Sequence, residues 1–130
     1  MTPALFLLFN HTLTETQEAD ARQNLGVAAI VLPPPEIRRL WGEVPPEADS
    51  LADHLAPICA WLAQESKPGD YILIQGEFGA TWIMVNEAAS IGLVPIYSTT
   101  KRMTEEVDLP GGEVDIRHRF VHVRYRRYGE

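Results

Sequence analysis

The amino-acid sequence predicts an α/β fold, in which a mostly parallel sheet is flanked by helices and followed by a C-terminal β-hairpin. Continuous apolar runs alternate with helix-like segments through residues 1–97, and this order builds a parallel sheet through right-handed crossovers. The runs lack the polar alternation of half-exposed strands, so both of their faces are expected to be covered. Residues 105–128 instead show two strand-like segments around a Pro-Gly-Gly turn.

Four apolar runs predict the parallel strands. They are residues 5–9, 27–32, 71–74 and 93–97. The missing alternation and the turn residues that bound each run favour strands covered on both faces. Asn10-His11 follows the first run, three consecutive prolines follow the second, and Gln75-Gly76 follows the third.

Helical segments connect these runs. They are residues 13–25, 35–41, 51–65 and 78–91. Thr12 and Glu15 fit a capping box at the start of the first helix, and Pro35 suits the first position of the second. Asp49 or Ser50 is expected to cap the third helix, whose apolar residues recur at helical spacing. A glycine follows the first and the last of these helices, as expected at a helix C-terminus.

The last segment predicts a β-hairpin. Its arms are residues 105–109 and 114–128, joined at Pro110-Gly111-Gly112. In the second arm the even-numbered residues 116–126 share one face, and the odd-numbered residues 117–125 share the other. Both faces mix apolar and cationic side chains, which suits a partly exposed or interface strand.

Composition indicates a single domain, residues 1–130. The net charge of −7 does not suit long DNA or RNA as a partner, but most basic residues follow residue 100 and permit a local anion site. Cys59 is the single cysteine, which excludes an internal disulfide and a cysteine-based zinc site. No apolar run approaches the roughly 20 residues of a membrane span, and residues 4–9 do not form a signal peptide, so we expect a cytoplasmic protein without a membrane partner.

The strand ends predict a ligand site, because ligands of open parallel sheets bind beyond the carboxyl ends of the strands. Amides, hydroxyls, glycines or cations follow the first, third and fourth strands. The candidate ligand-binding residues are Asn10, Gln75, Gly76, Glu77, Phe78, Gly79, Ser98, Thr99 and Thr100. With His11, Lys101 and Arg102 as candidate catalytic residues and with helix N-termini nearby, the pattern favours a phosphate site.

Each of these signals also has a plain structural interpretation. Residues 76–79 match neither a P-loop nor a dinucleotide fingerprint, and they would also fit a tight turn with a helix cap. Residues 98–100 would fit a loop with local side-chain bonds, Lys101-Arg102 a solvated pair, and His11 a loop histidine bonded to backbone.

Metal and hydrolase sites find less support in the sequence. His118 and His122 would share a strand face about 13 Å apart, too far to bind one metal ion together. The acidic residues form no ligand cluster, so neither a metal nor a cofactor is expected. No serine lies in a Gly-x-Ser-x-Gly setting, so a hydrolase triad has no support.

Four segments of the chain resemble a small family of standalone CRISPR-associated proteins of type III systems. They read LFLLFNHTLTETQEADARQNLGV, LIQGEFGATWIMV, VPIYSTTKR and FVHVRYRRYG, in order from Leu5 to Gly129. The distinctive parts are Asn-His-x-Leu-Thr, Gln-Gly-x-Phe-Gly-Ala-Thr and Tyr-Ser-Thr-Thr-x-Arg. The resemblance implies the Rossmann-like (CARF-like) fold of CRISPR-associated sensor domains, acting as a homodimer.

The resemblance also implies a function. Such proteins are ring nucleases, which bind and degrade cyclic oligoadenylate, the second messenger of type III antiviral defence; cyclic tetra-adenylate is the favoured ring. Attack by the ribose 2′-hydroxyl would need no metal and would leave 2′,3′-cyclic phosphate ends. By position and chemistry, Lys101 and Arg102 would neutralise phosphate charge, and His11 would act as general base or general acid.

Two other functions remain open on the sequence. The same site would serve a non-catalytic sensor or sponge that sequesters the ring. Alternatively, the basic hairpin would dock the protein onto a larger complex, with Arg124 and Arg126 in the contact.

Overall fold

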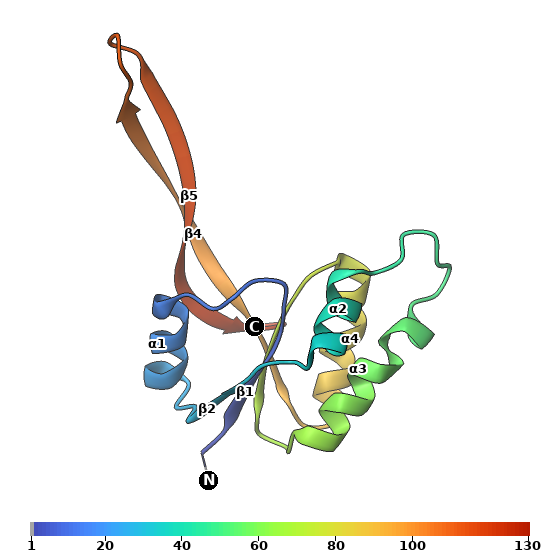
Figure 1. The fold of residues 1–130 in the computed structure, drawn as a ribbon. Helices are drawn as coiled ribbons and strands as arrows, with labels where there is room; N and C mark the ends of the chain where they lie inside the picture. The colour runs from blue at the N-terminus through green and yellow to red at the C-terminus, as the bar shows by residue number, and fades with distance from the viewer. Residues whose placement is uncertain (1) are drawn as a thin grey trace.

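A five-stranded sheet forms the centre of the structure, a computed structural model that describes residues 2–130 (Figure 1). The strands lie in the order β2-β1-β3-β4-β5. The elements along the chain are β1 (Ala4–Phe9), α1 (Glu15–Asn24), β2 (Ala29–Val31), α2 (Pro35–Gly42), α3 (Ala52–Glu65), β3 (Tyr71–Gln75), α4 (Phe78–Ser90), β4 (Val94–Asp108) and β5 (Val114–Arg127).

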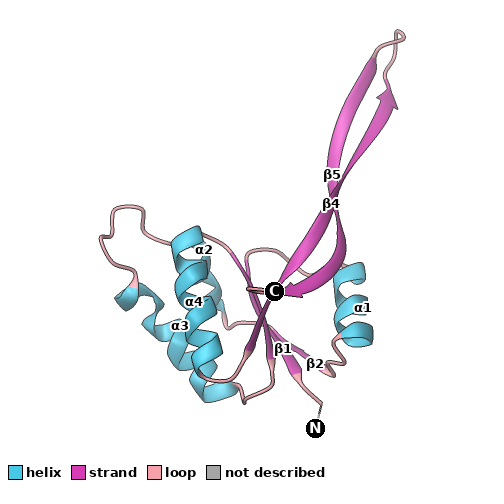
Figure 2. Cartoon of the chain, turned by 180° about the vertical axis from the view of Figure 1, so that it is seen from behind, coloured by secondary structure: helices cyan, strands magenta, loops and turns pink. Residues whose placement is uncertain are grey.

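The mixed α/β class predicted from the sequence is confirmed. Strands β1 to β4 pair in parallel, and β5 pairs with β4 in the antiparallel direction. Helix α1 covers one face of the sheet, while α2, α3 and α4 cover the other (Figures 1 and 2). The chain steps from β1 outward to β2 and then returns past β1 to β3, so the strand order reverses between β1 and β3.

Two apolar cores follow from this arrangement. On the α1 face, Leu5 and Leu7 of β1 pack with Ala21 of α1. On the opposite face, Phe6 and Leu8 of the same strand pack with residues of α2, α3 and α4. Successive residues of β1 therefore enter different cores, which explains its continuous apolar run.

The start of α1 differs from the predicted capping box. Thr14, not Thr12, is the N-cap: its hydroxyl accepts from the Gln17 N–H at 3.1 Å, and the Gln17 side chain accepts from the Thr14 N–H at 2.9 Å. Two Thr-x-x-Glu/Gln patterns overlap here, and the sequence motif did not distinguish them.

Other helix boundaries lie close to their predicted positions. Helix α2 begins at Pro35 as expected. Helix α3 begins at Ala52 with Leu51 as its N-cap residue, so the cap predicted at Asp49 or Ser50 was wrong. The Ser50 hydroxyl still accepts from the Ala52 N–H at 3.3 Å.

Strand β4 is much longer than predicted. The sequence predicted a strand that ends at Tyr97 and is followed by a loop, whereas β4 continues without a break to Asp108. It pairs with β3 only as far as Ile96, and β5 then supplies its partner as far as the Asp108–Val114 pair. The Ser-Thr-Thr-Lys-Arg segment, residues 98–102, is therefore strand and not loop.

The hairpin formed by β4 and β5 projects well away from the rest of the molecule (Figures 1 and 2). Its turn lies at Pro110-Gly111-Gly112, as predicted, and the Leu109 N–H donates to the Glu113 carbonyl at 2.8 Å. Gly111 and Gly112 have φ angles of 92° and 83°, which side-chain-bearing residues rarely adopt.

A β-bulge corrects the predicted faces of β5. The register shifts between Thr99 and Thr100, which pair with Arg124 and His122, so Val123 has no partner on β4. The even–odd alternation expected along residues 116–126 therefore breaks at Val123. As a result His122 and Tyr125, predicted on opposite faces, both contact α1.

Candidate active site at the carboxyl edge of the sheet

The carboxyl ends of β1 and β3 lie side by side. Phe9 and Gln75, the last residues of the two strands, are paired. Asn10 and His11 follow directly and are exposed, with the His11 ring against the edge of Phe9 at a centroid distance of 5.2 Å. The structure therefore brings these polar groups to the edge at which the strand order reverses, where ligands bind in open α/β sheets.

Gln75 also joins this edge to β4. Its side-chain oxygen accepts from the Ser98 N–H at 2.7 Å, just beyond the last β3–β4 pair. A pocket of about 480 Å³ opens here between the sheet and α4. Its lining residues are Gln75, Gly76, Phe78, Thr81, Tyr97, Ser98, Tyr128 and Gly129.

The pocket wall combines aromatic rings with a few polar groups. Tyr97 and Tyr128 pack at a centroid distance of 4.8 Å, and the Tyr128 hydroxyl donates to the Ile74 carbonyl at 2.5 Å. Phe78, the first residue of α4, is 92 % exposed at the rim. The Thr81 hydroxyl is buried without a hydrogen-bond partner in the described structure. Such a lining suits a flat, hydrogen-bonding ligand.

Gly76 was expected to let a ligand approach the backbone, but in the structure it makes room for a neighbouring side chain. A Cβ atom at this position would lie 2.8 Å from each of three ring atoms of Trp41. Trp41 is 2 % exposed and donates from its indole nitrogen to the Gln75 carbonyl at 3.0 Å. The absence of a side chain at Gly76 therefore lets the indole ring of Trp41 pack directly against the backbone at the end of β3.

Gly76→Ala is therefore expected to lower the free energy of unfolding by about 1–3 kcal/mol, because the enclosed ring of Trp41 cannot retreat. Urea unfolding measures the change. Gly42→Ala is a matched control, since its Cβ would meet only the side-chain oxygen of Asn10 at 3.4 Å. Equal effects of the two substitutions would contradict the packing role.

The N-terminus of α4 already holds a carboxylate. Glu77 is its N-cap residue, and the Glu77 side chain accepts from the Gly79 N–H. The prediction that this helix end offers free N–H groups to a phosphate was therefore wrong for Gly79. A phosphate near Glu77 also needs a cation to offset the carboxylate.

Lys101 and Arg102 lie farther from this edge than predicted. They are exposed residues on the projecting part of β4, about 10 Å and about 13 Å along the strand from Ser98. The Arg102 guanidinium donates to the His118 ring at 3.3 Å across the hairpin. Thr99 and Thr100 are strand residues beside the bulge, and the Thr99 hydroxyl is buried with no partner among the described residues.

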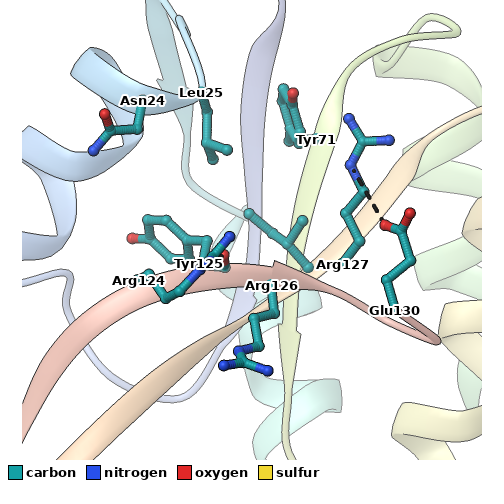
Figure 3. Close-up of a pocket in the computed structure, with 9 residues that line it drawn as sticks. Asn24, Leu25, Tyr71, Arg124, Tyr125, Arg126, Arg127 and Glu130 are labelled. Carbon is teal, nitrogen blue, oxygen red and sulfur yellow. Dashed lines mark hydrogen bonds and ion pairs between the residues drawn. The ribbon is translucent and has the colours of Figure 1, made fainter.

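Arg126 is a cation near this edge that sequence reasoning did not place beside Tyr97. It pairs with Tyr97 across the β4–β5 ladder, and paired residues of antiparallel strands share a face. Arg126 and Arg127 point to opposite sides of β5 (Figure 3). Arg126 therefore lies on the face of Tyr97, but it does not line the pocket beside Gln75 and instead lines the second pocket described below. Only the strand register, which the sequence did not reveal, brings it there.

A hydrogen-bonded chain of three side chains also escaped the sequence reasoning. Ser98 Oγ lies 2.5 Å from His122 Nδ1, and His122 Nε2 lies 2.6 Å from Asp20 Oδ2. The chain links β4, β5 and α1. The predicted absence of a hydrolase triad rested on the missing Gly-x-Ser-x-Gly motif, but this serine lies in the middle of a strand. The bulge at Val123, which turns His122 toward Ser98, had no sequence signal.

Electrostatics keep Asp20 ionised. Burial acts to raise its pKa, but hydrogen bonds from Asn24 and His122, together with the charges of His122 and Arg124, lower the pKa below 3.8. Asn24 donates to Asp20 Oδ1 at 2.5 Å, so both carboxylate oxygens are engaged.

Asp20 is expected to make stability depend on pH in the acid range. Its pKa is lower in the folded state, so its contribution is present above the unfolded value of 3.8 and is lost as the pH falls through the folded value. The difference in free energy of unfolding between the native protein and Asp20→Asn should therefore shrink as the pH drops from about 5. Urea unfolding at several pH values tests this, and a difference that persists at the acid limit would contradict it.

A second pocket, of about 420 Å³, lies on the α1 side of the sheet (Figure 3). It is lined by the end of α1 and the end of β5, and it contains the Arg127–Glu130 ion pair at 3.9 Å. Its residue Tyr71 is the first of β3, so this pocket lies toward the amino ends of the parallel strands. Open α/β sheets bind ligands at the opposite edge, which favours the pocket beside Gln75.

Two features are absent from residues 2–130. No group of three His, Cys, Asp or Glu side chains in that range is placed to hold a metal ion. Within the same residues no helix has the length and apolar character needed to cross a bilayer.

The fold and this edge define a mixed α/β protein with a candidate small-ligand pocket beside the strand-order reversal. The chain belongs to the family of the uncharacterized protein MJ1673, whose family model matches residues 3–126. It is 47% identical over 126 residues to the uncharacterized protein MJ1673 of Methanocaldococcus jannaschii, and the alignment covers 97% of each chain. No solved structure matches the chain.

Proposed function

We propose that this protein is a ring nuclease that binds and opens cyclic oligoadenylate, with cyclic tetra-adenylate as the favoured ring, on a Rossmann-like (CARF-like) fold. The observation that carries the proposal is the pocket beside Gln75, in which aromatic rings and hydrogen-bonding groups meet at the carboxyl edge of the sheet. The resemblance of four sequence segments to the type III CRISPR-associated family supplies the ligand class.

The pocket has the chemistry that an adenine base needs. Phe78, Tyr97 and Tyr128 offer ring faces, and stacking on an aromatic side chain stabilises a bound base by about 1–3 kcal/mol. A volume of about 480 Å³ accommodates one nucleotide of the ring, so the remaining nucleotides would extend along the surface or into a second copy of the site.

The phosphodiesters of the ring need local positive charge, since the chain is acidic overall. Arg126 pairs with Tyr97 next to the pocket without lining it, and His11 lies at the neighbouring strand end. The nucleophile is the ribose 2′-hydroxyl of the ligand itself. The protein then contributes alignment of that hydroxyl, charge neutralisation and proton transfer, with His11 as general base or general acid.

The proposal includes a homodimer built through the hairpin. A two-stranded hairpin on its own is marginally stable in water and needs a packing partner. Val114, Ile116 and Phe120 share one face of β5 and are exposed, Phe120 to 70 %. His118 lies between Ile116 and Phe120 on the same face, so the stripe is apolar at three of its four positions, and a partner surface is expected to cover it.

Charge along the hairpin favours a second copy of the chain as that partner. Strand β4 carries Lys101 and Arg102 toward the body, and Glu105, Glu106 and Asp108 toward the turn. Two hairpins crossing in opposite directions about a two-fold axis would set the cations of one against the carboxylates of the other. In this arrangement Lys101 and Arg102 would contact the partner molecule and not the pocket of their own chain.

One observation favours the alternative, a sponge that binds the ring without cutting it. Glu77 occupies the N-terminus of α4, and Lys101 and Arg102 lie on the hairpin. A single chain therefore has less positive charge at the pocket than the sequence suggested. It would stabilise the negative charge that develops on the phosphate during cleavage less well. A sponge retains affinity and lacks turnover.

Incubation with cyclic tetra-adenylate in EDTA, followed by chromatographic separation of products, tests the proposal. Linear products with 2′,3′-cyclic phosphate ends are expected. Calorimetry on the same sample separates the two functions: tight binding with an intact ring at stoichiometric protein identifies a sponge, and absence of binding for all ring sizes overturns both.

A further inference from the structure

We propose that the exposed face of α4 is a second base-binding site, in which a base stacks on Trp82 next to the base held in the pocket beside Gln75. The inference rests on the proposed cyclic oligoadenylate ligand and says where the nucleotide adjacent to the first one lies. The pocket beside Gln75 takes one nucleotide, so the next base needs a surface of its own.

Helix α4 carries two sets of side chains at helical spacing. One set, Ala80, Met84 and Ala88, is buried in the core. The other set leaves the core: Phe78 is 92 % exposed and Trp82 is 71 % exposed. Its members recur at three- and four-residue intervals and therefore share one face of the helix, and they are Phe78, Thr81, Trp82 and Val85. Two large aromatic side chains this exposed on one helix face indicate a binding surface.

This face forms one wall of a groove of about 300 Å³, and the chain that follows β5 forms the other wall. The lining residues are Phe78, Thr81, Trp82, Val85, Tyr128 and Gly129. None of these lining residues is charged, so the wall gives a phosphate no compensating charge. The planar face of a neutral base suits it better, because bases stack readily on aromatic side chains.

The groove adjoins the pocket beside Gln75. Four residues line both, namely Phe78, Thr81, Tyr128 and Gly129. Phe78 and Trp82 are one helical turn apart, so their side chains are neighbours on the helix surface. Proteins that bind single-stranded nucleic acids stack successive bases on successive aromatic side chains. A ligand with one base in the pocket therefore has its next base within reach of the Trp82 ring.

The fluorescence of Trp82 reports whether the groove is occupied. Trp41 is buried, and the ring of Trp61 packs against Phe6 at a centroid distance of 5.7 Å, so Trp82 is the tryptophan that a ligand in the groove contacts. Two ligands serve as probes: cyclic tetra-adenylate, and a linear 2′-deoxy di-adenylate that lacks the attacking hydroxyl and stays intact. Each should change the tryptophan emission. The change should disappear in Trp82→Phe and persist in Trp61→Phe.

Affinities from calorimetry test the stacking itself. Trp82→Ala should weaken the binding of both probes by about 10-fold to 100-fold, whereas Trp82→Phe keeps an aromatic ring and should stay within about 3-fold of the native affinity. Adenosine monophosphate has a single base, which the pocket beside Gln75 accommodates, so Trp82→Ala should bind it with native affinity.

Ile83→Ala is the matched control. Ile83 is an exposed apolar side chain of the same helix, next to Trp82 in the sequence, but it does not line the groove. Its substitution should leave the affinity for both probes at the native value. Thermal melts of every variant check that the fold is retained.

The outcomes separate the second base site from the proposed function. Native ring affinity in folded Trp82→Ala, or an emission change that survives in Trp82→Phe, overturns the second site and leaves ring cleavage standing. Di-adenylate binding that depends on Trp82, in a protein that binds no cyclic oligoadenylate, keeps the second site and overturns the proposed function. Weaker self-association of Trp82→Ala in sedimentation, without any emission change on adding nucleotide, would assign this face to a protein contact and overturn the second site.

Discussion

Phe120→Asp is expected to convert the proposed dimer into monomers and to raise its dissociation constant by about 10²-fold or more. The substitution puts a charge into the exposed apolar stripe of β5 that we propose to be buried between two hairpins. Loss of a central aromatic side chain from an interface costs at least about 2 kcal/mol, and burial of an unpaired carboxylate adds to that cost. Sedimentation equilibrium measures the change.

Leu32→Asp is the matched control for this experiment. Leu32 is a similarly exposed apolar side chain that follows β2, at the opposite edge of the sheet from the hairpin. It should leave the association unchanged. A native protein that is monomeric at micromolar concentration would contradict the dimer, and would favour a different partner for the hairpin.

Phe78→Ala is expected to weaken the proposed binding of cyclic tetra-adenylate by about 10-fold to 100-fold. Phe78 is almost fully exposed at the rim of the pocket, so its truncation removes a stacking surface and little packing within the protein. Base stacking on an aromatic ring is worth about 1–3 kcal/mol, which sets the expected range. Isothermal titration calorimetry measures the affinity.

Two further measurements make the Phe78 result specific. The free energy of unfolding of Phe78→Ala should differ from the native value by about 0.5 kcal/mol or less, as for a surface substitution. Leu32→Ala should bind the ring with native affinity. If Phe78→Ala binds the ring with native affinity, the ligand does not bind in the pocket beside Gln75 as proposed.

Sequence reasoning located the edge of the sheet at which the candidate site lies. The apolar runs and the polar residues after them predicted that the ends of β1 and β3 would meet, and Phe9 and Gln75 are indeed paired. That part could be predicted because strand length, burial on both faces and turn residues are local properties of the chain.

The same reasoning misplaced the cations because strand ends depend on a partner. Hydroxyl and basic residues after Tyr97 were taken as loop, whereas β5 offers a continuous ladder that keeps residues 98–108 extended. Threonine is common in strands, so the segment itself did not oppose this outcome. Lys101 and Arg102 consequently lie on the hairpin, and Arg126 takes the position beside Tyr97.

Glycine and histidine roles were also decided by neighbours distant in the sequence. Gly76 looked like a residue that lets a ligand approach, yet the ring of Trp41 occupies that space. His122 looked like one of several strand histidines. The unpaired Val123 rotates it toward Ser98, and α1 brings Asp20, distant in sequence, to its other nitrogen.

By itself the sequence determined the alternation of strands and helices, the edge where polar strand ends gather, and the turn of the hairpin. These depend on periodicity and on local backbone preferences that each segment carries alone. The tertiary structure decided the strand register, the length of β4, the bulge, and hence which side chains meet. Those contacts depend on long-range pairing and packing, and a shift of one residue exchanges the side chains on the two faces of a strand.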